Sequence, residues 1–166
     1  MRLLPLLFLA GAAFAADPVL RTEGVAGHDG VARPPVQFSL AELQSMPRVA
    51  LQAKAHDGKD HAFEGVALAE LLHRAGLPQG EEPRGPLLSR YLLVTAHDGY
   101  RAIFSLPELD PAFSDTRALV ADHMDGQPLP SRDGPLRLVL PAEKRETRWV
   151  LMLERIEILS APDPIR

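Results

Sequence analysis

The order of apolar and polar side chains along the chain predicts a domain built mainly of strands. A strand is predicted at 19–27, and residues 48–55 alternate between apolar and polar side chains, as a half-buried strand does. A continuous apolar run at 91–96 indicates a buried strand, and the chain is expected to run back at 100–105. Further strands are predicted at 62–64, 118–122, 136–141 and 149–159.

Short helices are predicted between these strands. Ser39 is a candidate N-cap with Glu42 three residues later, the pattern of a capping box, and Pro47 ends this helix. Residues 65–76 carry an apolar stripe at helical spacing, and Gly76 gives the helix end. A third short helix is predicted over 105–109. Many strands joined by a few short helices indicate an α+β domain.

The first 15 residues have the pattern of a secretory signal peptide, because one Arg and an apolar run precede Ala13-Phe14-Ala15. The run is short for a membrane span, and a retained anchor is the alternative. Residues 16–166 contain no long linker, so we expect them to form one domain. No twin arginine precedes the run, so we expect a periplasmic protein secreted through a Sec-type leader.

Composition and motifs narrow the classes of function. The chain has 18 Lys and Arg against 22 Asp and Glu and no basic block, which disfavours nucleic acid as a partner. It has no Cys, which excludes disulfides and a C-x-x-C-H haem attachment. His-Asp-Gly occurs at His28, His56 and His97, but Asp-Gly favours tight hairpins, so we interpret these triplets as turns rather than metal ligands. No nucleophile elbow is present. The sequence therefore predicts neither catalytic residues nor a dedicated metal site.

Five segments in order carry a resemblance to a known family. They are PVQFSLAELQSMP (35–47), FEGVALAELLHRAGLP (63–78), VTAHDGYRAIFSLPELD (94–110), ALVADHMDGQPLPSRDGPLRLVLP (118–141) and TRWVLMLERIEI (147–158). Together they resemble the oxidoreductase molybdopterin-binding domain, the core of sulfite oxidases and their bacterial relatives. The resemblance implies a mixed, strand-rich sulfite oxidase-like fold with short helices over nearly the whole mature chain.

Two departures from the family pattern change what the resemblance implies. Family members hold molybdenum partly through one Cys, in a stretch that corresponds to 53–56 here, and this chain has none. Soft thiolate ligation cannot be supplied by Ser, Ala or His without changing the metal chemistry. The family's glycine-rich turn is replaced by residues 142–146. The resemblance therefore implies a pterin or molybdopterin-like ligand without ligation of molybdenum by Cys.

A pterin is a flat bicycle that stacks on aromatic or guanidinium planes and forms hydrogen bonds at its edge. The resemblance places its binding site between the 91–105 hairpin and the 133–149 segment. The candidate ligand-binding residues are Trp149, Arg148, Arg137, Tyr100, Asp98 and Asp133. For the aromatic residues the alternative is a packing role, and for the arginines it is a solvated surface position.

Three functions follow from this sequence. The first is a non-catalytic periplasmic pterin-binding protein that senses a ligand or docks on the periplasmic domain of a membrane signalling protein. The second is a molybdopterin-dependent oxidoreductase with a non-Cys metal site, and the third is an adaptor domain whose pocket has closed. The missing Cys and the Sec-type leader favour binding over catalysis, because the family resemblance implies that the metal cofactor is inserted in the cytoplasm.

Overall fold

The computed structural model describes residues 17–25, 31–77, 85–110 and 113–162. Its strands are β1 (Pro18–Val25), β2 (Ala32–Ser39), β3 (Arg48–Lys54), β4 (Asp60–Ala67), β5 (Arg90–Ala96), β6 (Arg101–Ser105), β7 (Leu119–Met124), β8 (Gln127–Pro128), β9 (Arg137–Val139) and β10 (Leu153–Ser160). Its helices are α1 (Leu40–Ser45) and α2 (Leu68–Arg74), with short 3-10 turns η1 (Gly85–Ser89), η2 (Pro107–Leu109) and η3 (Glu146–Arg148). The predicted strand-rich α+β class is confirmed. The predicted leader and the His28 triplet lie outside the described residues.

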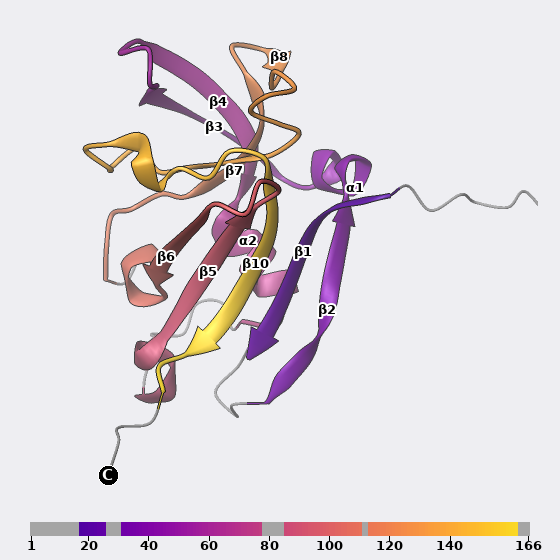
Figure 1. Cartoon of the computed structure of the whole chain (residues 1–166), viewed down its shortest axis with the longest axis vertical. Coiled ribbons are helices and arrows are strands. Elements are labelled where there is room, and N and C mark those ends of the chain that lie inside the picture. The colour runs from indigo at the N-terminus through magenta and orange to yellow at the C-terminus, as the bar shows by residue number, and fades with distance from the viewer. Residues whose placement is uncertain (1–16, 26–30, 78–84, 111–112, 163–166) are drawn as a thin grey trace, which may run out of the picture.

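The strands form two sheets. Sheet A has the order β2-β1-β10-β5-β6, and sheet B has the order β3-β4-β7-β8 with β9 also paired to β7. The β1–β10 pairing is parallel, whereas the other pairings are antiparallel, so sheet A is mixed. Figure 1 shows the long strands of sheet A below and the β3–β4 hairpin above them. The two strands β5 and β6 are joined at His97-Asp98-Gly99, and β3 and β4 at His56-Asp57-Gly58, so these two triplets are the predicted turns.

Helix α1 begins where the sequence predicts it. The backbone N–H of Glu42 donates to Ser39 Oγ at 3.2 Å, and the backbone N–H of Ser39 donates to Glu42 Oε2 at 2.7 Å, which completes the capping box. The helix ends at Ser45, before Pro47. It packs against β1 and β2 of sheet A and against β4 of sheet B, so its cap fixes an element that joins the two sheets.

Helix α2 is shorter than the helix predicted over 65–76. It begins at Leu68, because Gly65, Val66 and Ala67 continue β4 and pair with β7. A Cβ atom on Gly65 would lie 2.0 Å from the carbonyl oxygen of Val120, so only glycine allows the two backbones this approach. Strand pairing therefore overrides the helical spacing of the first three residues.

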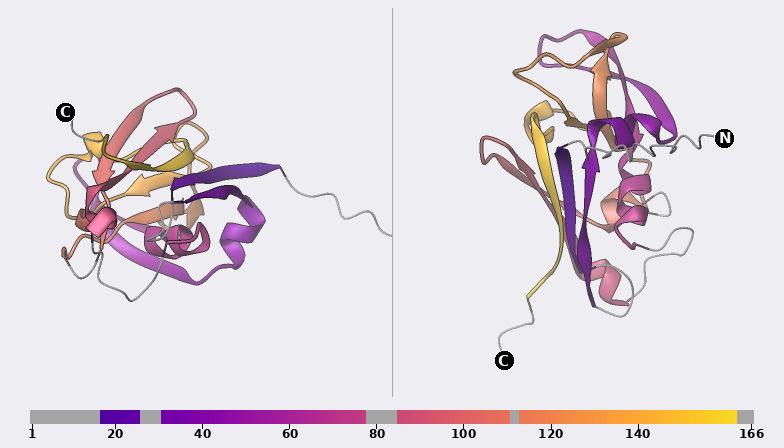
Figure 2. Two further views of the ribbon diagram at one scale, coloured as in Figure 1. Left: turned by 90° about the horizontal axis from the view of Figure 1, so that it is seen from below. Right: turned by 90° about the vertical axis from the view of Figure 1, so that its right-hand side faces the viewer.

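The hydrophobic core lies between the two sheets and the helices. Figure 2 shows both α-helices on the same side of sheet A. The largest fully buried aromatic side chains are Phe63 of β4 and Phe104 of β6, one from each sheet. In the described part of the chain no helix has the length and apolar character needed to cross a membrane.

One histidine joins the two turns at the far end of sheet B. His61 Nδ1 lies 2.6 Å from Asp125 Oδ2, and its Nε2 lies 3.2 Å from both carboxylate oxygens of Asp57. The hydrogen bond that His61 donates to Asp125 has the largest effect and the one to Asp57 the next largest, and both raise the pKa of His61. The imidazolium therefore connects the β3–β4 turn to the β7–β8 turn.

Replacing Gly65 by Ala should destabilise the domain by about 1–3 kcal/mol or more, because the new methyl group overlaps backbone that cannot move away without breaking β-pairing. The matched control is Gly58→Ala, where no atom lies within 4 Å and only the φ of +79° is unfavourable. Urea unfolding measures both. Equal losses in the two variants would show that the contact between β4 and β7 is not tight.

Stability should depend on pH through His61. Its folded-state pKa is raised, so its contribution is complete below the unfolded value of about 6.5 and is lost as pH rises through the folded value. The pKa values of Asp57 and Asp125 are lowered, so their contribution is lost as pH falls below about 4. The stability difference between wild type and His61→Gln should therefore be larger at about pH 5 than at about pH 8.5. Urea titrations at both values test this, with the exposed His97→Gln as the control. A difference that does not change with pH would contradict the ion pairing.

Candidate functional site

Arg137 is the centre of the candidate site. It lies in β9, where all three residues are buried, and only 6% of its surface is exposed. Its guanidinium carbon lies 4.9 Å from the ring centre of Trp149 and 5.4 Å from that of Phe63. Its Nη2 donates to Glu146 Oε2 at 3.2 Å. The arginine is therefore not the solvated surface charge that the sequence left as the alternative.

Burial and two neighbouring carboxylates act in opposite directions on the pKa of Arg137. Burial lowers the pKa of Arg137, and the charges of Asp133 and Glu146 oppose this effect. Its Nε is buried and has no hydrogen-bond partner among the described residues. Buried donors in native proteins are nearly always paired with protein, water or ligand, so we expect this nitrogen to donate to a water or to a ligand.

Trp149 is part of the core as well as of the candidate site. Only 4% of its surface is exposed, and its indole Nε1 donates to the carbonyl oxygen of Leu140 at 3.0 Å. The Phe63 ring meets it edge-on, with ring centres 5.7 Å apart. Since Arg137 also lies against the indole, the ring serves as the platform for that guanidinium.

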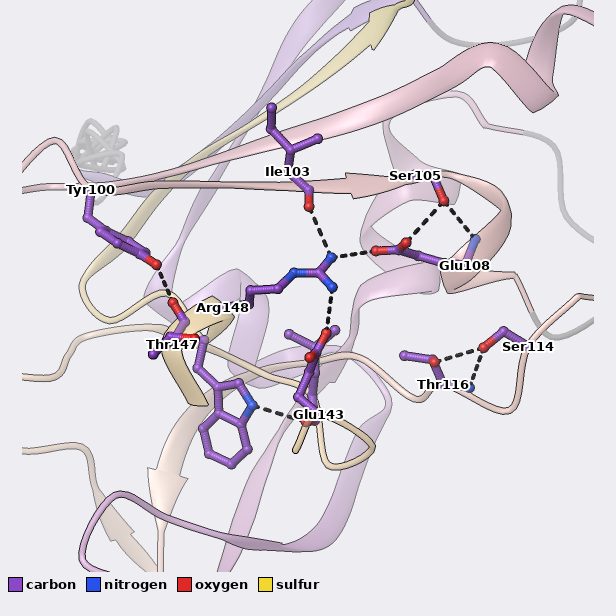
Figure 3. Close-up of polar contacts among 11 residues, drawn as sticks. Tyr100, Ile103, Ser105, Glu108, Ser114, Thr116, Glu143, Thr147 and Arg148 are labelled. Carbon is purple, nitrogen blue, oxygen red and sulfur yellow. Dashed lines mark hydrogen bonds and ion pairs between the residues drawn. The ribbon is translucent and has the colours of Figure 1, made fainter. Parts of the chain in front are cut away.

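Arg148 anchors the loop between β9 and β10 to sheet A. Its guanidinium donates to Glu108 at 2.6 Å, to Glu143 at 2.8 Å and to the carbonyl oxygen of Ile103 at 3.0 Å, as Figure 3 shows. Its guanidinium carbon lies 4.3 Å from the ring centre of Phe104. These contacts use both terminal nitrogens, so this arginine is already engaged by the protein itself.

Tyr100 and Asp98 belong to the β5–β6 turn. The Tyr100 hydroxyl donates to the carbonyl oxygen of Thr147, next to Arg148 (Figure 3). Asp98 Oδ1 accepts from the backbone N–H of Tyr100 at 2.9 Å, which is a turn contact. The residue Tyr100 is 45% exposed and is thus the accessible aromatic residue of the six candidates.

The structure links the six predicted residues in two groups, one around Arg137 and one at the β5–β6 turn and Arg148. Tyr100 contacts Thr147, and Trp149 contacts Arg137. Asp133 acts on Arg137 through its charge. Sequence reasoning missed the partners that hold the two arginines, which are Phe63, Glu108, Glu143 and Glu146. Glu143 and Glu146 lie three residues apart in the sequence and could have indicated partners for the arginines. The segment was instead interpreted as a basic cluster because of its Lys and Arg residues.

The stretch that corresponds to the family's metal-ligating Cys lies at the end of β3. Ala53 and Ala55 are buried, with 5% and 7% of their surfaces exposed, and His56 is exposed in the turn. No group of three or more His, Cys, Asp or Glu side chains suited to a metal ion occurs among the described residues.

Comparisons with known proteins identify the family. The sequence matches the oxidoreductase molybdopterin binding domain over residues 27–165, so the chain belongs to this family. No curated protein matches the sequence. The fold is similar to the crystal structure of the sulfane dehydrogenase SoxCD from Paracoccus pantotrophus, with a TM-score of 0.63 and 19% identity. The match covers 84% of this chain and 37% of that chain, so the protein spans well under half of this neighbour's length. The predicted family and the sulfite oxidase-like fold are confirmed.

The residues present do not fit the metal-loaded cofactor of the family. A chain without Cys offers no thiolate for molybdenum, and the corresponding stretch carries two buried Ala residues, an exposed Lys and an exposed His. The two arginines assigned to the ligand are each paired with carboxylates of the chain. The organic part of the family's cofactor needs no thiolate, and the buried Nε of Arg137 is a donor to which an acceptor of such a ligand could bind.

Replacing Trp149 by Phe should destabilise the domain by about 1–3 kcal/mol, because the smaller ring fills less of the core and the Leu140 carbonyl keeps only its hydrogen bond from the backbone N–H of Glu143. Urea unfolding followed by circular dichroism measures the loss, since the variant has no Trp fluorescence. A variant as stable as wild type would show that the hydrogen bond of the indole N–H does not stabilise the fold.

Proposed function

We propose that this protein is a non-catalytic periplasmic pterin-binding protein that reports its ligand to the periplasmic domain of a membrane signalling protein. The proposal takes the organic part of the family's cofactor as the ligand and omits the metal. Membership of the molybdopterin-binding family supports the ligand class. The leader predicted over residues 1–15 supports the compartment.

The observation that carries the proposal is the buried Nε of Arg137. Few buried donors in folded proteins lack an acceptor, and those that do often belong to functional sites. The edge of a pterin presents a carbonyl oxygen and ring nitrogens that accept hydrogen bonds. On the β5–β6 turn, the half-exposed ring of Tyr100 offers a surface on which a flat ligand can stack.

The absence of a thiolate favours ligand binding over catalysis by molybdenum as the function of the site. Oxygen-atom transfer in this family uses molybdenum held by a protein sulfur, and the chain has no sulfur ligand other than four Met. The thioether of Met is a neutral ligand and does not replace a thiolate. A pterin site without the metal remains suited to sensing or docking.

One observation favours an adaptor role as the second candidate. The Trp149 ring is 4% exposed and covered by Arg137, as expected of a pocket that has closed around its own side chains. In that case the family fold is retained for contact with a partner protein and not for a ligand.

Calorimetry with 7,8-dihydroneopterin tests the proposal. Wild type should bind, and Tyr100→Leu should bind about 5–150-fold more weakly, because a ring stacked on an aromatic platform contributes about 1–3 kcal/mol. The control is Tyr91→Leu, which removes the other Tyr, at the opposite end of β5. Metal analysis of protein purified from the periplasm should show no stoichiometric molybdenum. Wild type that binds no pterin would favour the adaptor, and about one molybdenum per chain would favour the oxidoreductase.

A further inference from the structure

The carboxylate of Glu146 neutralises a cation from which water is largely excluded. The side chain of Arg137 is 7% exposed and that of Glu146 is 16% exposed, and they meet at 3.2 Å. The Phe63 and Trp149 rings lie against the same guanidinium. Because a buried charge needs a partner, the counter-ion at this position must come from the protein or from a ligand. In this chain it comes from the protein.

Arg148 is neutralised in the same way, by Glu108 at 2.6 Å and Glu143 at 2.8 Å. Asp133 adds a further negative charge that acts on Arg137. The two arginines are thus matched with more carboxylates than they need. A phosphate dianion near Arg137 would either displace Glu146 or lie beside it, and like charges at short range repel strongly. An uncharged ligand meets neither obstacle.

We infer that Glu146 is a specificity-determining residue, which occupies the anion position on Arg137 so that the site accepts pterins without a phosphate and rejects phosphorylated ones. This inference rests on the proposed function and narrows its substrate class. Glu146 holds Nη2 of Arg137 and leaves Nε for a neutral acceptor. The exposed Lys144 and Arg145 of the same loop attract anions only through solvent, where salt screens the attraction.

The test compares two ligands that differ only in the phosphate, 7,8-dihydroneopterin and its monophosphate, by calorimetry at about 0.1 M salt. Wild type should bind the unphosphorylated pterin at least tenfold more tightly. In Glu146→Gln the affinity for the monophosphate should rise at least tenfold, because Arg137 then lacks its counter-ion. Glu146→Asp keeps the charge and should keep the preference for the unphosphorylated ligand.

The matched control is Glu70→Gln on the exposed face of α2. Glu70 forms a surface ion pair with Arg74 at 2.9 Å, so the variant removes the same charge from an arginine pair elsewhere on the molecule. The ratio of its affinities for 7,8-dihydroneopterin and for the monophosphate should equal that of wild type. A change as large as that in Glu146→Gln would show an effect of net charge alone and would overturn the assignment to Glu146.

The outcomes separate this inference from the proposed function. Wild type that binds both ligands equally, or Glu146→Gln that keeps the wild-type ratio, overturns the inference and leaves pterin binding intact. Wild type that binds neither ligand overturns both. If Glu146→Gln does not fold, the double variant Arg137→Met with Glu146→Gln removes both charges together. In that variant both affinities should fall because the Nε donor is lost, and the ratio of the two affinities should be below threefold; a wild-type ratio would again overturn the inference.

Discussion

The buried guanidinium of Arg137 is the constraint around which the candidate site is arranged. A cation with 6% of its surface exposed loses most of its hydration, and the protein must replace it. Phe63 from β4, Trp149 from the segment before β10 and Glu146 from η3 supply that replacement. Three parts of the chain are therefore fixed by one side chain. A substitution at Phe63, Trp149 or Glu146 therefore also changes the surroundings of the Arg137 guanidinium.

The same segment also joins the two sheets through its backbone. The N–H of Leu138, beside Arg137, donates to the carbonyl of Val150, and the N–H of Leu153 at the start of β10 donates to the carbonyl of Leu136, each at 2.9 Å. Strand β9 belongs to sheet B and β10 to sheet A. A movement of the η3 loop would thus act on the central strand of sheet A and on the edge of sheet B together.

Local signals were sufficient to predict the parts of the fold that depend on neighbours in sequence. The capping box of Ser39 and the turns at His56 and His97 are set by residues within a few positions of one another, and the structure has them. The helix predicted from Gly65 began three residues too early because β7, distant in sequence, pairs with this segment. The candidate site also combines residues that the sequence indicates with residues that only the three-dimensional structure brings together. The arginines were identifiable from the family pattern, but the glutamates that neutralise them are defined only by distance in space.

Sheet A has two open edges, and both are protected against pairing with another strand. Strand β2 carries Pro34 and Pro35, which have no N–H to donate. On the opposite edge, the carbonyl of Ile103 in β6 accepts a hydrogen bond from Arg148. The arginine assigned to ligand binding thus also occupies an edge group that another strand would otherwise use. Loss of this side chain would leave β6, with its exposed isoleucine, open to association between molecules, so Arg148 opposes aggregation whether or not a ligand is bound.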